Sequence, residues 1–191
     1  MERSAIYRRA LAPLMGMLGV MGVAGAGGGA AIGLHTPGAF AAYWMAISVV
    51  AILGALLLVR RQALKDSELF WSLPTRRVAQ ALLPPLFAGL AAGLFFFFAE
   101  LKSPFPAWTL AAAWMILYGC ALHSAGFFMA RGIKLFGWGF IIGGCALALA
   151  PLCPATQPPV AWANIAMGVS FGGAHLAYSL YLYFTEGKTT S

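Results

Sequence analysis

His123 and His175 are the residues whose chemistry is hardest to explain by packing alone, because each lies inside a long apolar run. An ionisable side chain within a membrane span is costly and indicates a function. At 1.5 Å per helical residue, the two rings lie roughly 12 and 16 Å from the ends of their spans. If their helix faces meet, the pair is a candidate site for a haem, a metal ion or proton relay. The alternative is two buried neutral imidazoles, each hydrogen-bonded to a nearby group. The candidate partners are Ser124, Tyr118, Ser170, Tyr178 and a backbone carbonyl.

The last apolar run holds a second set of polar residues, which together form a candidate substrate or proton path. They are Asn164, Ser170, His175 and Tyr178. Residues 168–172 also match the G-x-S-x-G motif, but a hydrolase needs that motif at a strand-to-helix elbow, and here it falls within an expected helix. The five Asp and Glu residues all fall at or beyond the ends of the expected spans. These patterns predict no catalytic set and no metal cluster, so they favour a non-enzymatic protein and leave enzyme activity open.

The composition determines the kind of element that must position these residues. The chain is 61% hydrophobic and 9% charged, with a mean hydropathy of +0.83, whereas a soluble domain carries about 25% charged residues. At about 20 residues per span, residues 1–191 predict one all-α integral membrane domain with six transmembrane helices in three antiparallel hairpins. The expected spans are residues 11–34, 39–59, 78–99, 108–130, 135–150 and 160–185.

Basic residues flank the apolar runs, which predicts both topology and partners. Of the twelve Lys and Arg residues, only Lys102 falls on the side opposite the two termini. The positive-inside rule therefore places both termini and the basic loop 60–77 in the cytoplasm, and predicts a multi-pass protein of the plasma membrane, or the inner membrane of a bacterium. The net charge of +7 is explained by anionic headgroups and does not predict nucleic-acid binding. A cytoplasmic protein partner is the other expected contact of this loop, through Arg60, Arg61, Lys65, Trp71, Arg76 and Arg77.

Local signals predict how the basic loop is built. The second span is expected to continue as a helix through Arg60 to about Phe70, because residues 62–69 are good helix formers. The third helix is expected to begin with Ser72 or Thr75 as its N-cap and with Pro74 in its first turn.

The first span carries glycines at every third position from Gly16 to Gly28. Small residues at such spacing let a second helix approach closely, and GxxxG patterns are typical of membrane helix contacts. The pattern favours packing against another span of the same chain, with a homo-oligomer through this span as the alternative.

Three functions remain open. The first is a membrane-embedded sensor or regulatory protein, or a subunit of an assembly, that acts through a cytoplasmic partner. The second is a small transporter or a transporter substrate-binding subunit, because size and span count are similar to the substrate-capturing subunits of energy-coupling-factor vitamin transporters. That resemblance implies an outward-facing pocket with polar groups such as Asn164. The third is a redox protein that binds haem or a metal through His123 and His175.

Overall fold

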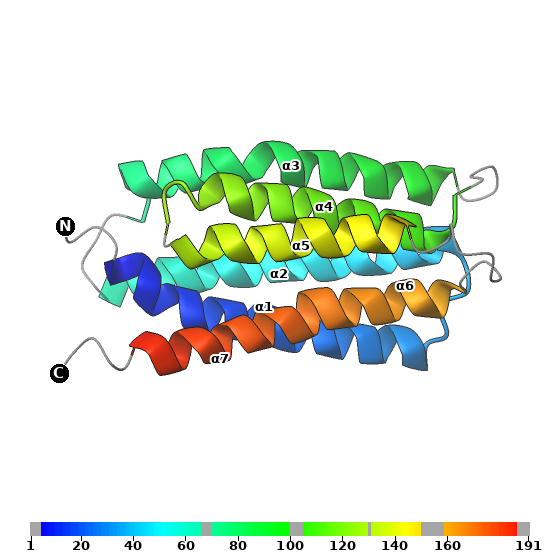
Figure 1. Cartoon of the computed structure of the whole chain (residues 1–191), viewed down its shortest axis with the longest axis horizontal. Helices are drawn as coiled ribbons and strands as arrows, with labels where there is room; N and C mark the ends of the chain where they lie inside the picture. The colour runs from blue at the N-terminus through cyan, green and yellow to red at the C-terminus, as the bar shows by residue number, and fades with distance from the viewer. Residues whose placement is uncertain (1–4, 66–69, 100–104, 130, 150–158, 187–191) are drawn as a thin grey trace.

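Six helical rods make up the part of the chain that this computed structural model describes, residues 5–65, 70–99, 105–129, 131–149 and 159–186; these residues contain no strand. The rods run along the long axis of the molecule (Figure 1). They are α1 (Ala5–Ala31), α2 (Pro37–Lys65), α3 (Leu73–Phe98), α4 (Ala107–Ala125), α5 (Arg131–Leu149), and a last rod of α6 (Val160–Met167), a π-helix η3 (Gly168–Ala174) and α7 (His175–Glu186).

Five of the rods are long and apolar enough to cross a membrane, namely α1, α2, α3, α5 and the rod α6–η3–α7. The predicted class, an all-helical protein with several membrane-spanning segments, is therefore supported. The helix α4 is not among the five. It has 19 residues, and Trp108, Tyr118 and His123 lower its hydropathy. A sixth span thus remains a prediction.

The helix boundaries depart from the predicted spans at several ends. Helix α1 begins at Ala5, six residues before the predicted span. Helix α2 continues past Arg60 to Lys65, in line with the predicted extension of the second span. Helix α4 ends at Ala125 rather than at residue 130, because Gly126 caps it and the chain then reverses into α5. The start of α3 is as predicted, with Ser72 as the N-cap residue and Pro74 in the first turn. Residues 66–69, within the predicted extension of α2, lie outside the described part.

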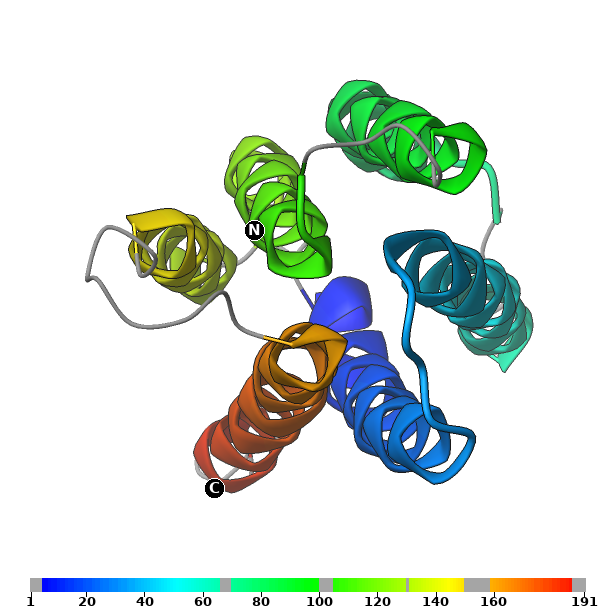
Figure 2. The ribbon, with the colours of Figure 1, turned by 90° about the vertical axis from the view of Figure 1, so that its right-hand side faces the viewer.

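Helix α4 lies between α5 and α3 (Figure 2) and also packs against α6 and α2. The closest pair is α4 and α5, because Gly119 and Gly137 face each other. A Cβ added at Gly119 would lie 2.6 Å from the Gly137 carbonyl oxygen. The end of the bundle where α2, α4 and α6 begin has a core of Phe40, Trp44, Leu110 and Ala163. A second core, which includes Leu11, Met15, Leu122, Ile133 and Leu182, fills the opposite half.

The glycines of α1 face other helices of the same chain. A Cβ added at Gly22 would lie 2.5 Å from the backbone nitrogen of Gly172, and one at Gly19 would lie 2.7 Å from that of Leu176. Backbone contacts this close exclude any side chain, so glycine is what allows α1 to lie against η3 and α7. Gly27, by contrast, has no neighbour within 4 Å. A homo-oligomer through α1 remains an untested prediction. Gly19 and Gly22 would not lie in its interface, because they contact helices of the same chain.

Candidate functional site

Asn164, in α6, is a buried polar side chain that contacts two other helices. Its Nδ2 donates to the carbonyl oxygen of Ala26 across 2.7 Å, and its Oδ1 accepts from Nε1 of Trp44 across 3.1 Å. A Cβ at Gly29 would lie 2.7 Å from Oδ1, so the glycine leaves the space that the amide needs. Asn164 therefore ties α6 to α1 and α2.

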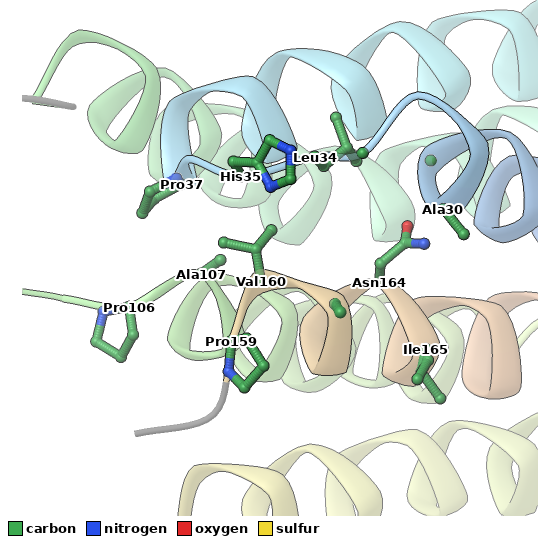
Figure 3. Close-up of a pocket in the computed structure, with 13 residues that line it drawn as sticks. Ala30, Leu34, His35, Pro37, Pro106, Ala107, Pro159, Val160, Asn164 and Ile165 are labelled. Carbon is green, nitrogen blue, oxygen red and sulfur yellow. The ribbon is translucent and has the colours of Figure 1, made fainter. Parts of the chain in front are cut away.

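A pocket of about 550 Å³ lies beside this amide, at the end of the bundle where α2, α4 and α6 begin. Figure 3 shows its walls, with Asn164 reaching from α6 toward the α1 side. The turn from α1 into α2 forms one wall, and it depends on Gly33, whose φ of +66° favours glycine. The described residues that line the pocket are Gly29, Ala30, Gly33, Leu34, His35, Pro37, Pro106, Ala107, Pro159, Val160, Ala161, Asn164 and Ile165.

His175 lies in a separate site, the aromatic cluster, formed by rings from α4, α5, η3 and α7. Its side chain is 1% exposed, and Nε2 lies 2.8 Å from the hydroxyl of Tyr118. Its Nδ1 is buried and makes no hydrogen bond with the described residues. The cluster consists of Tyr118, Phe136, Phe140, Phe171, His175 and Tyr178.

The π-helix η3 leads directly into His175, and the sequence patterns did not predict it. Single π-turns inside α-helices are rare overall, and many of those that occur lie at functional sites. Gly172 lies against the backbone of α1, with a Cβ there only 2.7 Å from the nitrogen of Val23. Ser170 is buried and donates to the Ala166 carbonyl within its own helix. The available signal was the glycine-rich run 168–173, which also fits an ordinary packed helix.

The two histidines do not share a site among the described residues. His123 contacts the rings of Phe127 and Trp138, at 5.6 and 5.7 Å between centroids, and no ring contact joins it to His175. The residues of the aromatic cluster also do not fit a haem. Tyr118 occupies Nε2 of His175, and the rings of Phe136, Phe140 and Phe171 stand 5.1 to 6.1 Å from the imidazole. The described residues contain no group of three or more His, Cys, Asp or Glu that could hold a metal ion.

The predicted substrate path is likewise not one site. Asn164 belongs to the pocket, whereas His175 belongs to the aromatic cluster. Tyr178 stacks on Phe136 at 4.5 Å in that cluster. Ser170 turns its hydroxyl back to its own helix. The structure therefore separates the polar residues of the last rod into a pocket residue and a cluster of packed rings.

The basic residues gather at the end of the bundle opposite the pocket. Arg60, Arg61 and Lys65 are exposed on the last turns of α2, and Arg76 and Arg77 are exposed on the first turns of α3. Trp71 lies between these two groups and is 58% exposed. These six side chains form what we call the basic surface. Asp66 and Glu68, which belong to the same loop in the sequence, lie outside the described residues.

Comparisons with family models, with curated proteins and with solved structures give no match for this chain.

Proposed function

We propose that this chain is a plasma membrane protein that senses a small molecule in the pocket and acts through a cytoplasmic partner at the basic surface. One observation carries the proposal. The pocket and the basic surface lie at opposite ends of one helical bundle, where a membrane would separate them. The positive-inside rule assigns the basic surface to the cytoplasm and the pocket to the outer side.

The bundle offers a mechanical link between the two ends. Helix α2 begins at the pocket with Pro37 and ends at the basic surface with Lys65. Near its start, Trp44 is bonded to the pocket residue Asn164. A ligand that hydrogen-bonds to Asn164 would change the strength of its bond to Trp44 and so the restraint on α2. Helix α2 carries three of the five basic residues of the surface.

A partner can be tested without changing the charge that sets the topology. The variant Trp71→Ala/Arg76→Lys/Arg77→Lys keeps both positive charges, but it removes the exposed indole and the planar guanidinium groups that pair with carboxylates. Crosslinking followed by purification in detergent should recover a stoichiometric partner with the wild-type chain and not with this variant. The control Phe87→Ala, at an exposed apolar position of α3, should retain the partner. Absence of any stoichiometric partner from the wild-type sample contradicts the proposal.

A second candidate function, a small transporter or a transporter substrate-binding subunit, is favoured by the same pocket, since it requires an outward-facing pocket with Asn164. A transporter must expose its site to both sides of the membrane in turn, whereas a sensor need not. In a chain without its native cysteines, Ile165→Cys tests this at an exposed pocket position. Labelling by an impermeant maleimide in both right-side-out and inside-out vesicles indicates a transporter, and labelling from one side indicates a sensor.

A further inference from the structure

The pocket combines one fixed polar group with apolar walls. We propose that it binds a small uncharged amphipathic molecule, whose one hydroxyl, carbonyl or amide group hydrogen-bonds to the side chain of Asn164. This inference rests on the proposed function for its role as a sensing site, but the binding itself can be tested alone.

Asn164 has hydrogen-bonding capacity left for a ligand. A primary amide carries two N–H donors and an oxygen with two lone pairs. One donor is used by the carbonyl of Ala26 and one lone pair by the indole of Trp44. One donor and one lone pair remain, so the amide can bind either a donor or an acceptor on a ligand.

The amide is also held in place before any ligand arrives. Its bonds run to two different helices, and Gly29 lies directly beneath its oxygen. A polar group fixed in this way loses little conformational freedom on binding, which favours affinity and orientation.

The remaining walls indicate the rest of the ligand. The pocket volume of about 550 Å³ lies within the range of about 300 to 1,000 Å³ found for small-molecule sites. None of the described residues that line the pocket is Asp, Glu, Lys or Arg; besides Asn164, the polar side chain among them is His35. Apolar side chains dominate, among them Leu34, Val160 and Ile165. Burying an ion without a partner is costly, and this favours an uncharged ligand.

The test uses three matched photoaffinity probes, namely an octanol that carries a diazirine, the octane with the same diazirine, and the corresponding octanoate. The full-length chain is labelled in detergent micelles, and the labelled residues are mapped by mass spectrometry. The octanol should label the pocket walls, at Leu34, Val160 or Ile165, in competition with unlabelled octanol. It should do so about fivefold more than the octane, the factor that one net hydrogen bond contributes.

Two variants and one control separate binding at the pocket from partition into the micelle. Asn164→Leu should abolish the preference for octanol over octane. Ala161→Phe fills the pocket from an exposed lining position and should remove the labelling, whereas Ala177→Phe, at an exposed position outside the pocket, should not. If Asn164→Leu fails to fold, Ala161→Phe still decides the question.

Three results would overturn the inference. They are equal labelling of lipid-facing residues such as Val49 and Phe87, stronger labelling by the octanoate, and labelling unaffected by Ala161→Phe. The proposed function can fail separately from this inference. If the wild-type chain recovers no stoichiometric partner but the octanol still labels the pocket, the sensor function is refuted and the ligand class is not.

Discussion

Trp44 donates its indole N–H to Oδ1 of Asn164 across 3.1 Å, and both side chains are only 4% exposed. The same Asn164 amide donates to the carbonyl of Ala26. One side chain thus joins α1, α2 and α6 beside the pocket. In a core with little water, each of these groups depends on the others for its hydrogen bonds.

Replacing Asn164 should therefore cost more than removing one of its partners. Asn164→Leu leaves the indole N–H of Trp44 and the carbonyl of Ala26 without this partner, and we expect a loss of about 1 to 3 kcal/mol in the free energy of unfolding. Trp44→Phe removes one hydrogen bond and keeps a ring, so a smaller loss is expected. SDS-induced unfolding in mixed micelles measures both. The control is Ile165→Leu at the adjacent exposed position, and equal stability of all three variants would contradict the assignment.

Two glycines of α1 provide a matched test of the contact with η3. Gly22→Ala places a Cβ 2.5 Å from the backbone nitrogen of Gly172, a contact that neither helix can relieve without moving. We expect this overpacking to cost about 1 to 3 kcal/mol. Gly27→Ala adds the same methyl group to the same helix in open space and should change stability by less than about 0.5 kcal/mol. The same unfolding assay, applied to both variants, should separate them clearly; similar values would mean that α1 does not pack against η3 as described.

The sequence predicted the elements better than their arrangement. Apolar runs bounded by basic residues and prolines located all six helices, because the length of a span and the positions of charge depend on local composition. The end of α4 was placed five residues too late, since the apolar run continues through Phe127 and Phe128. Gly126 ends the helix because the chain must turn there to bring α5 against α4, and that is a tertiary requirement.

The site residues show the same limit. Composition marked Asn164 and His175 as unusual, but no periodicity shows which neighbour meets each of them. Trp44 and Trp114 were the missed signal. Both lie deeper than interfacial tryptophans, and a buried indole N–H needs an acceptor. The indole N–H of Trp44 donates to the side chain of Asn164, and that of Trp114 donates to the carbonyl of Gly89 across 2.8 Å.

The contact between Tyr118 and His175 should be measurable as an energetic coupling. Tyr118→Phe removes the hydroxyl that lies 2.8 Å from Nε2, and His175→Leu removes the ring. A double-mutant cycle on unfolding free energies should give a coupling of about 0.6 kcal/mol, the average for hydrogen bonds between membrane helices, and no more than about 1.7 kcal/mol. Tyr43→Phe serves as the control. It removes a bond to the carbonyl of Gly25, away from the aromatic cluster, so its effect should add to that of His175→Leu. No coupling in the Tyr118 cycle would show that the contact does not stabilise the fold.

The predicted orientation can be checked at two exposed positions at opposite ends of the bundle. In a chain without native cysteines, His35→Cys lies beside the pocket and Lys65→Cys at the basic surface. An impermeant maleimide added to intact cells should label His35→Cys alone, and the same reagent should label Lys65→Cys after permeabilisation. The reverse pattern would contradict the positive-inside assignment. Labelling of both positions from outside would show that the basic surface and the pocket are not on opposite sides of a membrane.

The π-helix gives the sharpest prediction about the last rod. Its hydrogen bonds link each residue to the fifth one along, so the turn holds one residue more than an α-helix would. Deleting Gly173, which is exposed and has nothing within 4 Å, should convert the turn to an α-helix and leave the faces of α6 and α7 unchanged. Deleting Ala177 instead removes a residue from regular α-helix and rotates the rest of α7 by about 100°. That rotation takes Ser179 away from the carbonyl of Ala12 and Leu182 out of its core.

The two deletions should therefore have different effects although both remove one small residue from the same rod. We expect the Gly173 deletion to give a monodisperse protein with near wild-type unfolding, and the Ala177 deletion to be strongly destabilised. Equal damage from both would mean that the wide turn is needed for folding. The Gly173 deletion can also fold normally and no longer retain the partner at the basic surface. That result would show that the π-helix is needed for binding the partner and not for stability.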